Sequence, residues 1–506
     1  MMAVSASVPD SLNVLTLNSF DMMKVFNPWL VSSNPAGHFY NPELYPGLLH
    51  LDYLKEEGDY KRVQEGDLLN TYSFNTERYK RIKKTSFFGY FKYNKGFEEG
   101  TNYTDVNDPY RGSPYLLIDV IGNDIIDREF FSLRGDISTP VFKHLNWGFS
   151  AAMNVGLASQ DRDPRPKNKV LDLNVSQGLI LDFSWISLGV NGLYSYYNED
   201  IEIEIIRENV QMAFLQLHGF DTYTYHVAAS FNRLYKRNTA GGEGQLNIRL
   251  GGLNSIFGAK VLYIDETADD GRKAGDASWS YIKNDSRLSG NELAAYHSTV
   301  FRTGNIINTL NVNWTSRSLI GAEIIQRLEN VGEAGAVDWV DYAVEEKYSS
   351  LVYEGSLGYS FYLMKDEYRK NFGLKLGLNI LGSEQAYYVP DMKDGYQNKV
   401  LSAGIDKSFY YKKHELNIGA NIKFKENISS VQEYDQESFI SRTLLLPDFN
   451  YLTGSYRAQG FELGYALKLR KLFDKYYFRS SLHFYKGESD LQRTILNFST
   501  GVFFKN

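Results

Sequence analysis

The sequence predicts an all-β protein, a transmembrane antiparallel β-barrel of about 18 strands with an N-terminal plug segment. Three observations predict it: long stretches that alternate between apolar and polar residues, polar rows rich in glycine, and a high aromatic content. Side chains of a strand point to opposite faces with a period of two, so each such stretch has one apolar and one polar face. Tyr, Phe and Trp make up 15% of the chain, which suits strands and the aromatic girdles of a membrane barrel.

The strand at the end of the chain shows the alternation most clearly. Its apolar face carries Leu496, Phe498, Val502 and Phe504, and its opposite face carries Asn497, Ser499 and Gly501. Similar alternation recurs over residues 147–157, 372–380, 416–424 and 461–470. A soluble β-sandwich also alternates, but its strands are usually shorter and its surface rows rarely hold so much glycine. We therefore expect apolar rows facing lipid and polar rows facing a lumen, in the bacterial outer membrane.

Composition narrows the class of protein further. No run of about 18 apolar residues occurs, so no transmembrane helix is predicted. The chain has 506 residues, no cysteine and a net charge of -7. The lack of cysteine fits an oxidising envelope compartment, and the mild acidity argues against nucleic acid as a partner. An export signal is expected ahead of this sequence, and Val4, Ser5 and Ala6 are similar to the small-residue end of such a signal.

Residues 1–46 differ from the rest of the chain and are interpreted as a plug or hatch. The segment contains Asn27, Pro28 and Trp29, and then Asn34 and Pro35. A residue before proline is pushed out of the helical region, so both Asn-Pro pairs predict turns. A disordered periplasmic tail is the alternative, although large apolar residues such as Trp29 are unusual in disordered tails. Residues 47–506 are predicted to form the barrel.

The barrel region reads as a series of hairpins in which short turns alternate with long polar loops. An even strand number is expected for a bacterial barrel, with about 18 strands as first choice and about 16 as the next. The long loops are expected near residues 99–126, 159–168, 201–242, 267–303, 332–347, 388–397 and 428–453.

The polar rows predict a lumen that is basic in its C-terminal half. The inward residues expected there are Lys375, Lys423, Lys468, Arg470, Arg479 and His483, against the acidic Glu462 and, earlier in the chain, Glu202 and Glu204. A basic wall can line a pore for anionic solutes or anchor the plug, and the sequence leaves both open. Ser481 and His483 share one row and could in principle support acyl transfer, but a lumen-lining role is the interpretation preferred here.

Several short segments carry a resemblance to a known family. They are Asn27 to Trp29, Ser33 to Gly37, Gly58 to Tyr60, Gln64 to Gly66 and the loop 161–168. With these segments the chain resembles an uncharacterised family of outer-membrane β-barrels found in Bacteroidota, which implies location and fold but no chemistry. It is also loosely similar to long-chain fatty-acid transporters, whose N-terminal hatch contains an Asn-Pro-Ala segment like Asn34 to Ala36. The polar lumen rows and the predicted strand number depart from those transporters.

The function expected from these observations is uptake or diffusion of a small solute, gated by the N-terminal plug. Outer-membrane lipid is the expected surrounding, and no catalysis, metal or cofactor is expected. The alternative is a non-conducting accessory or structural subunit of an outer-membrane transport or secretion complex, with a protein partner.

Overall fold

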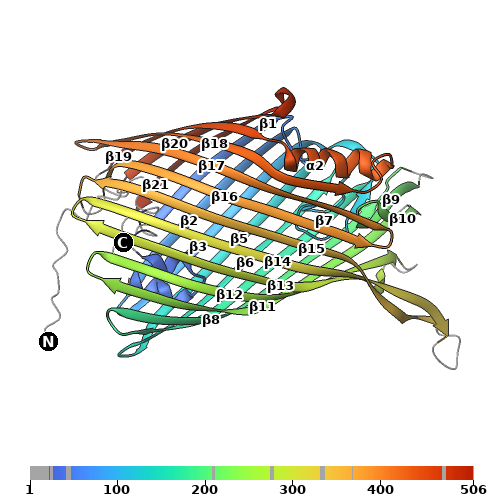
Figure 1. The fold of residues 1–506 in the computed structure, drawn as a ribbon, viewed down its shortest axis with the longest axis horizontal. Helices are drawn as coiled ribbons and strands as arrows, with labels where there is room; N and C mark the ends of the chain where they lie inside the picture. The colour runs from blue at the N-terminus through green and yellow to red at the C-terminus, as the bar shows by residue number, and fades with distance from the viewer. Residues whose placement is uncertain are drawn as a thin grey trace.

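The protein is a closed β-barrel, elongated along the barrel axis (Figure 1). The computed structural model describes residues 22, 25, 27–41, 47–207, 211–228, 230–273, 279–330, 337–366, 369–469 and 475–504. Most of these residues form one 18-stranded antiparallel sheet, in which β1 pairs with both β2 and β21 and β8 pairs with β11. The predicted fold class and strand number are confirmed.

The barrel strands differ greatly in length. The first nine are β1 (Gly47–Gly58), β2 (Leu68–Ile82), β3 (Thr85–Asn102), β5 (Gly122–Phe142), β6 (Leu145–Gln160), β7 (Arg165–Asp182), β8 (Ile186–Glu204), β11 (Ser230–Leu250) and β12 (Leu253–Lys273). The other nine are β13 (Trp279–Thr303), β14 (Ile306–Asn330), β15 (Val337–Met364), β16 (Lys370–Tyr388), β17 (Asp391–Tyr411), β18 (His414–Glu433), β19 (Tyr456–Lys468), β20 (Lys475–Gly487) and β21 (Gln492–Phe504). Three shorter strands form a separate sheet: β4 (Leu117–Asp119), β9 (Met212–Gly219) and β10 (Thr222–Ala228).

An apolar belt covers the outside of the barrel. Leu376, Leu401, Ile405 and Phe461 share the outward phase of neighbouring strands and are 46–54% exposed. A row of large apolar side chains facing water would be unfavourable, whereas hydrocarbon solvates it. The closed sheet also leaves no unpaired edge in its membrane-spanning part, as a lipid environment requires. The protein is therefore an outer-membrane β-barrel.

Helices contribute little to the described structure. They are the 3-10 helices η2 (Pro28–Val31), η3 (Pro35–Tyr40) and η5 (Glu488–Asp490), the π-helical turn η4 (Ser441–Leu445) and α2 (Leu446–Thr453). Among the residues described, no helix is long and apolar enough to cross a membrane.

One end of the barrel is formed by short turns, and we call it the short-turn end. Its two-residue turns include Gly251-Gly252, between β11 and β12, and Gly304-Asn305, between β13 and β14. Gly251 and Gly304 adopt φ values of +57° and +56°, the left-handed conformation that tight hairpin turns need and glycine adopts without strain. The first residue of β1, Gly47, pairs with Phe504 of β21 at this end.

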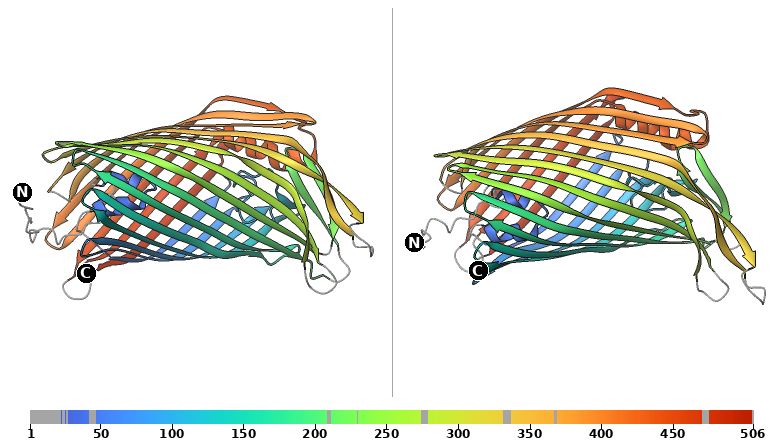
Figure 2. Two further views of the ribbon diagram at one scale, coloured as in Figure 1. Left: turned by 90° about the horizontal axis from the view of Figure 1, so that it is seen from below. Right: turned by 60° about the horizontal axis from the view of Figure 1, so that its bottom comes forward.

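The opposite end, called the long-loop end, has longer strands than the sequence predicts. Much of the expected loops 267–303 and 332–347 is strand, and the expected loop 388–397 is a tight turn between β16 and β17. The strand extensions are polar and are joined by cross-strand ion pairs, such as Arg287–Asp265 at 2.6 Å and Lys393–Glu433 at 2.8 Å. The hairpin of β14 and β15 projects beyond the rest of the rim (Figure 2).

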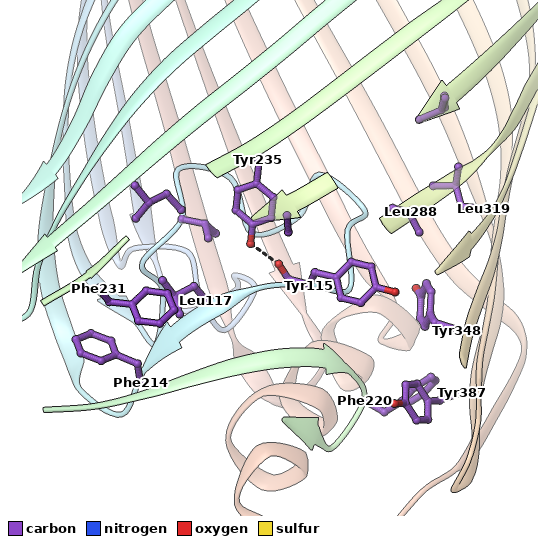
Figure 3. Close-up of a cluster of buried hydrophobic side chains, with 14 of the residues drawn as sticks. Tyr115, Leu117, Phe214, Phe220, Phe231, Tyr235, Leu288, Leu319, Tyr348 and Tyr387 are labelled. Carbon is purple, nitrogen blue, oxygen red and sulfur yellow. Dashed lines mark hydrogen bonds between the residues drawn. The ribbon is translucent and has the colours of Figure 1, made fainter. Parts of the chain in front are cut away.

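Loops of the long-loop end fold into the barrel and build a hydrophobic core there (Figure 3). Residues 103–121, called the lid segment, bring Tyr115 and Leu117 against Phe214 of β9 and Phe231 and Tyr235 of β11. All five side chains are at most 6% exposed. The core closes this end of the lumen with apolar side chains that are buried on all sides.

A buried arginine fixes the lid segment to the wall. The Arg233 guanidinium is fully buried and donates to both carboxylate oxygens of Asp270, at 2.6 and 2.8 Å. It also donates to the Tyr115 carbonyl at 3.1 Å, which the Tyr235 hydroxyl contacts as well (Figure 3). Burying this charge requires such a complete set of partners.

Candidate functional site

The candidate site is the barrel interior beside the plug segment, the name kept here for residues 27–41. Its two 3-10 helices start as the Asn-Pro pairs predict. The Asn27 side-chain oxygen accepts from the Trp29 amide at 3.2 Å, and that of Asn34 accepts from the Ala36 amide at 3.0 Å. Proline follows each asparagine at a position where its missing N–H costs nothing. Asn27 also donates to the Gly37 carbonyl at 3.0 Å, so the two helices form one compact unit.

Polar groups attach the plug segment to the wall. The Asn34 amide nitrogen donates to the carbonyls of Leu179 and Val190, at 3.2 and 3.3 Å, and to Gln245 Oε1 at 3.0 Å. The Ser33 amide and hydroxyl both contact a Glu243 carboxylate oxygen. The wall contacts therefore include side chains of β11 and carbonyls of β7 and β8.

A second set of polar contacts holds the other half of the plug segment. His38 Nε2 lies 2.8 Å from Asp136 Oδ2 on β5, and both side chains are nearly buried. Ser138, two residues further along β5, donates to the Ala36 carbonyl at 2.9 Å. Asn146 on β6 donates to the Tyr40 hydroxyl at 2.8 Å.

One aromatic side chain adds an apolar anchor. Trp29 is 2% exposed and packs with Ile180 and Ile256, which point inward from β7 and β12. Glycines allow this close approach: a Cβ at Gly189 would lie 2.8 Å from the Trp29 ring, and one at Gly148 would lie 2.2 Å from the Ala36 amide nitrogen. The predicted plug residues Asn27, Pro28, Trp29, Asn34 and Pro35 are all buried inside the barrel. Of residues 1–26, only Met22 and Val25 are described, so the 1–46 boundary stays a prediction.

A cavity of about 830 Å³ lies between the plug segment and the wall. Charged side chains of both signs line it: Glu77, Arg134, Glu243 and Lys260. Glu243 connects the plug to the wall, because it also accepts from the Tyr296 hydroxyl at 2.6 Å. The cavity therefore offers hydrogen-bonding and charged groups to a polar guest, at the position where the plug is held.

A second cavity, of about 380 Å³, lies beside the other half of the wall. Lys375, Glu462 and Arg479, three of the predicted lumen residues, line it together with Asp52 and Asp406. The two aspartates were not among the lumen charges expected from the sequence. Asp406 pairs with Lys370 at 2.5 Å, so the wall here is less basic than its lysines alone indicate.

The remaining predicted lumen residues have the following positions. Lys423 and His483 share the inward phase, opposite Ala458 and Gly460 of β19. Lys468 pairs in register with Lys475, which makes an ion pair with Glu415 at 2.9 Å. Arg470 lies outside the described residues.

The expectation that Glu202 and Glu204 face the lumen is wrong. Their neighbours Ile201 and Ile203 are fully buried in the interior core, so the glutamates have the outward phase. Glu202 instead pairs on the outside with Lys169 at 2.6 Å. The inward isoleucines belong to the core at the long-loop end, where the lumen face of the strand is apolar.

The sequence analysis did not predict a set of contacts by which Arg111 of the lid segment attaches to the barrel wall. Arg111 reaches into the lumen, with its guanidinium over the rings of Tyr197 and Tyr235 at 4.2 and 4.9 Å. Its Nη2 lies 3.4 Å from Glu266 Oε2 of β12. The inward phase of Tyr197, Tyr235 and Glu266 could be predicted from strand alternation, but their loop partner could not.

Within the described ranges, no group of three or more His, Cys, Asp or Glu side chains is arranged to hold a metal ion.

The fold and the site define a class: an outer-membrane β-barrel with an internal plug segment. The chain belongs to a family of unknown function, DUF6850, whose model matches residues 35–504. No sequence among curated proteins matches it.

Similar solved structures include transporters, receptors and an importer. They include the copper transporter OprC (8% identity, TM-score 0.37, covering 91% of this chain and 80% of that one). The ferric preacinetobactin receptor of Acinetobacter baumannii has 10% identity and a TM-score of 0.37 (90% and 80% covered). The RagAB peptide importer has 6% identity and a TM-score of 0.42 (90% and 86% covered). At TM-scores below 0.5, these likenesses support no conclusion about this chain.

Proposed function

We propose that this barrel is a gated passage for a small polar solute and that the plug segment is its gate at the short-turn end. The observation that carries the proposal is the way the plug segment is held: by polar side chains, beside a charged cavity. In bacterial barrels the short turns face the periplasm, so the gate would open on that side.

Polar attachment makes the plug segment releasable. A hydrogen bond exchanged for one to water contributes only about 0.5–1.5 kcal/mol net. The freed groups, such as Glu243, Gln245 and Asp136, would be rehydrated in a water-filled lumen. Release would also expose the Trp29 ring, which is the main apolar anchor of the segment.

The cavity indicates the kind of solute. Its volume of about 830 Å³ falls in the range of small-molecule sites, roughly 300–1,000 Å³. Its charges of both signs favour a polar or zwitterionic guest over a hydrocarbon chain. The looser likeness to fatty-acid transporters therefore concerns only the N-terminal hatch sequence, and it does not indicate that this barrel transports a fatty acid. That likeness and an origin in Bacteroidota stay predictions, as does the absence of catalysis.

Conductance in planar bilayers tests the proposal once the plug segment and the lid segment, which close the two ends of the lumen, have been removed. Residues 27–41 are deleted, and residues 103–121 are replaced by a two-glycine turn. Asn102 and Gly122 are register partners, so a short turn can join β3 to β5 without moving either strand. We expect no steady conductance from the intact protein and steady conductance from the doubly deleted barrel, with each single deletion as a matched control. Folding is verified by heat-modifiable migration in gels.

The second candidate function is a non-conducting accessory subunit. The apolar closure of the long-loop end and the projecting β14–β15 hairpin favour it, because a lumen closed by a packed core does not conduct and the hairpin extends beyond the rim, where a partner could bind. A folded double deletion that does not conduct would contradict the passage and leave the accessory role as the better explanation.

A further inference from the structure

Three buried aspartates meet where the lid segment joins β5. Asp105 and Asp119 are each 1% exposed and Asp124 is 4% exposed. The Asp105 amide donates to the Leu117 carbonyl at 3.3 Å, and the Tyr103 amide donates to the Ile121 carbonyl at 3.1 Å. The two arms of the lid segment therefore run side by side and bring Asp105 near Asp119.

The oxygens of this cluster lack partners. Asp119 Oδ1 accepts from the Ile121 amide at 2.8 Å. Both carboxylate oxygens of Asp105, Asp119 Oδ2 and Asp124 Oδ1 are buried and accept no hydrogen bond from the described residues. Gln160 Oε1 is also buried and unpartnered, and Gln160 Nε2 donates to the Thr104 carbonyl at 2.8 Å, which places this amide next to Asp105. Arg162 Nε lies 3.9 Å from Asp124 Oδ1, too far for a hydrogen bond. Buried polar groups without partners are rare because desolvation is costly, so this cluster requires an explanation.

The raised pKa values of the lid aspartates show that no positive charge among the described residues compensates their carboxylates. Burial, with repulsion from Asp124, raises the pKa of Asp119 to about 7, and burial with repulsion from Asp119 raises the pKa of Asp105 well above its ordinary value. The pair lacks positive charge, and either a proton or a bound cation can supply it.

The donor chemistry favours one class of cation. Every unpartnered atom is an oxygen, the donor that hard divalent cations prefer. Ca²⁺ accepts six to eight oxygens in flexible geometry and tolerates water and amide carbonyls, whereas Mg²⁺ demands a compact octahedron. The amide oxygen of Gln160 and the backbone carbonyls of an irregular loop are ligands of the kind Ca²⁺ uses.

We propose that the lid segment binds one Ca²⁺ ion between Asp105 and Asp119, with Asp124 adding negative charge and Gln160 Oε1 an amide ligand. In the described part of the chain the three carboxylates do not form a metal site by themselves, so the proposal requires backbone carbonyls and water to complete the shell. Few charged ligands imply weak binding, with a Kd on the order of 10⁻⁴–10⁻³ M, the range of extracellular modules. The ion would tie both arms of the lid segment to β5, and this inference does not depend on what the barrel transports.

Calorimetric titration with CaCl₂ tests the proposal on the full chain. The protein is refolded in detergent without lipopolysaccharide, whose phosphates bind Ca²⁺ themselves. We expect one site, and a loss of affinity of at least about tenfold in the isosteric double variant Asp105→Asn with Asp119→Asn. Asp161→Asn is the matched control, because Asp161 is exposed on the neighbouring loop. Gln160→Ala should weaken binding with all three carboxylates retained.

Hydrogen exchange over residues 103–121 supplies an independent measurement. Ca²⁺ should slow exchange there in the intact protein and in Asp161→Asn, but not in the double variant. No binding below about 10 mM Ca²⁺, or equal binding by the double variant, would overturn the proposal. So would lid protection that changes with pH but not with Ca²⁺, since the aspartates would then hold a proton.

Discussion

The two ends of the barrel are closed by different proportions of polar and apolar contacts. At the short-turn end, Asn34, Ser33 and His38 hold the plug segment by polar contacts to side chains of the wall. At the long-loop end, the lid segment is closed by buried aromatic and aliphatic side chains such as Leu117 and Phe214. Water can replace polar contacts at little cost, but it cannot replace apolar packing. The difference indicates that the short-turn end is the more easily opened one.

The largest expected effect is at the long-loop end. Phe214 is fully buried between lid and wall, so Phe214→Ala should lower the local unfolding free energy by about 3–5 kcal/mol. Hydrogen exchange of β4 and β9 measures this loss. Tyr225→Ala is the control, since Tyr225 is 60% exposed on the adjoining strand β10. Equal effects of the two changes would show that apolar packing does not close this end.

A smaller effect is expected when the plug segment is displaced from the wall side. Gly148→Ala would place a methyl group 2.2 Å from the Ala36 amide nitrogen, a backbone atom that cannot rotate away. Overpacking of this kind costs about 1–3 kcal/mol, so the plug segment should open more often. Protease cleavage within residues 27–41 should accelerate, while Gly135→Ala, where nothing lies within 4 Å, should leave the rate unchanged. An unchanged rate in Gly148→Ala would contradict the observed seating of the plug.

Lid stability should also depend on pH when no Ca²⁺ is present. The raised pKa of Asp119, about 7, means that the folded lid binds more protons than the unfolded one between roughly pH 4 and 7. Its stability should therefore fall as the pH rises through that range. Burial raises the pKa of Asp105 and Asp124 as well, which strengthens this loss of stability, and Arg162 offsets part of the effect at Asp124. Protection factors of residues 103–121 measure the trend, which Asp119→Asn should flatten.

The smallest expected effect is on ion preference after both closures are removed. Lys423 and Lys468 share the inward phase, and their charges should favour anions in the lumen. Lys423→Glu with Lys468→Glu should shift the reversal potential at asymmetric salt toward cations. Lys412→Glu, at an exposed turn, is the control. Cation preference before any substitution would show that the negative charges of Asp52, Asp406 and Glu462 determine the electrostatic potential of the lumen wall.

The sequence predicts the fold well where a strand crosses the lipid belt. There the apolar row is continuous, as at Leu376, and alternation alone identifies the strand. Beyond the belt both faces are polar, as in the Asp265–Arg287 pairing of β12 and β13, and the pattern resembles a loop. The expected loops 267–303 and 332–347 were therefore largely strands.

The sequence predicts the plug residues of the candidate site but not the wall residues that they contact. Asn-Pro chemistry identifies Asn27 and Asn34 as turn residues, and their caps form as expected. Gln245, which Asn34 contacts on the wall, and Glu243, which Ser33 contacts, lie more than 200 positions away in the chain. No local pattern links such residues, because the barrel register that aligns them is set by many strand pairs together.

The seam between β1 and β21 has a consequence for the order of assembly. Gly47 to Gly58 pair with Arg493 to Phe504, so the wall cannot close until the last strand is in place. The plug segment rests on β5, β6, β7 and β11, strands that precede the final third of the chain. The plug can therefore settle onto a curved, still open sheet, and the closing seam then encloses it without any need for threading.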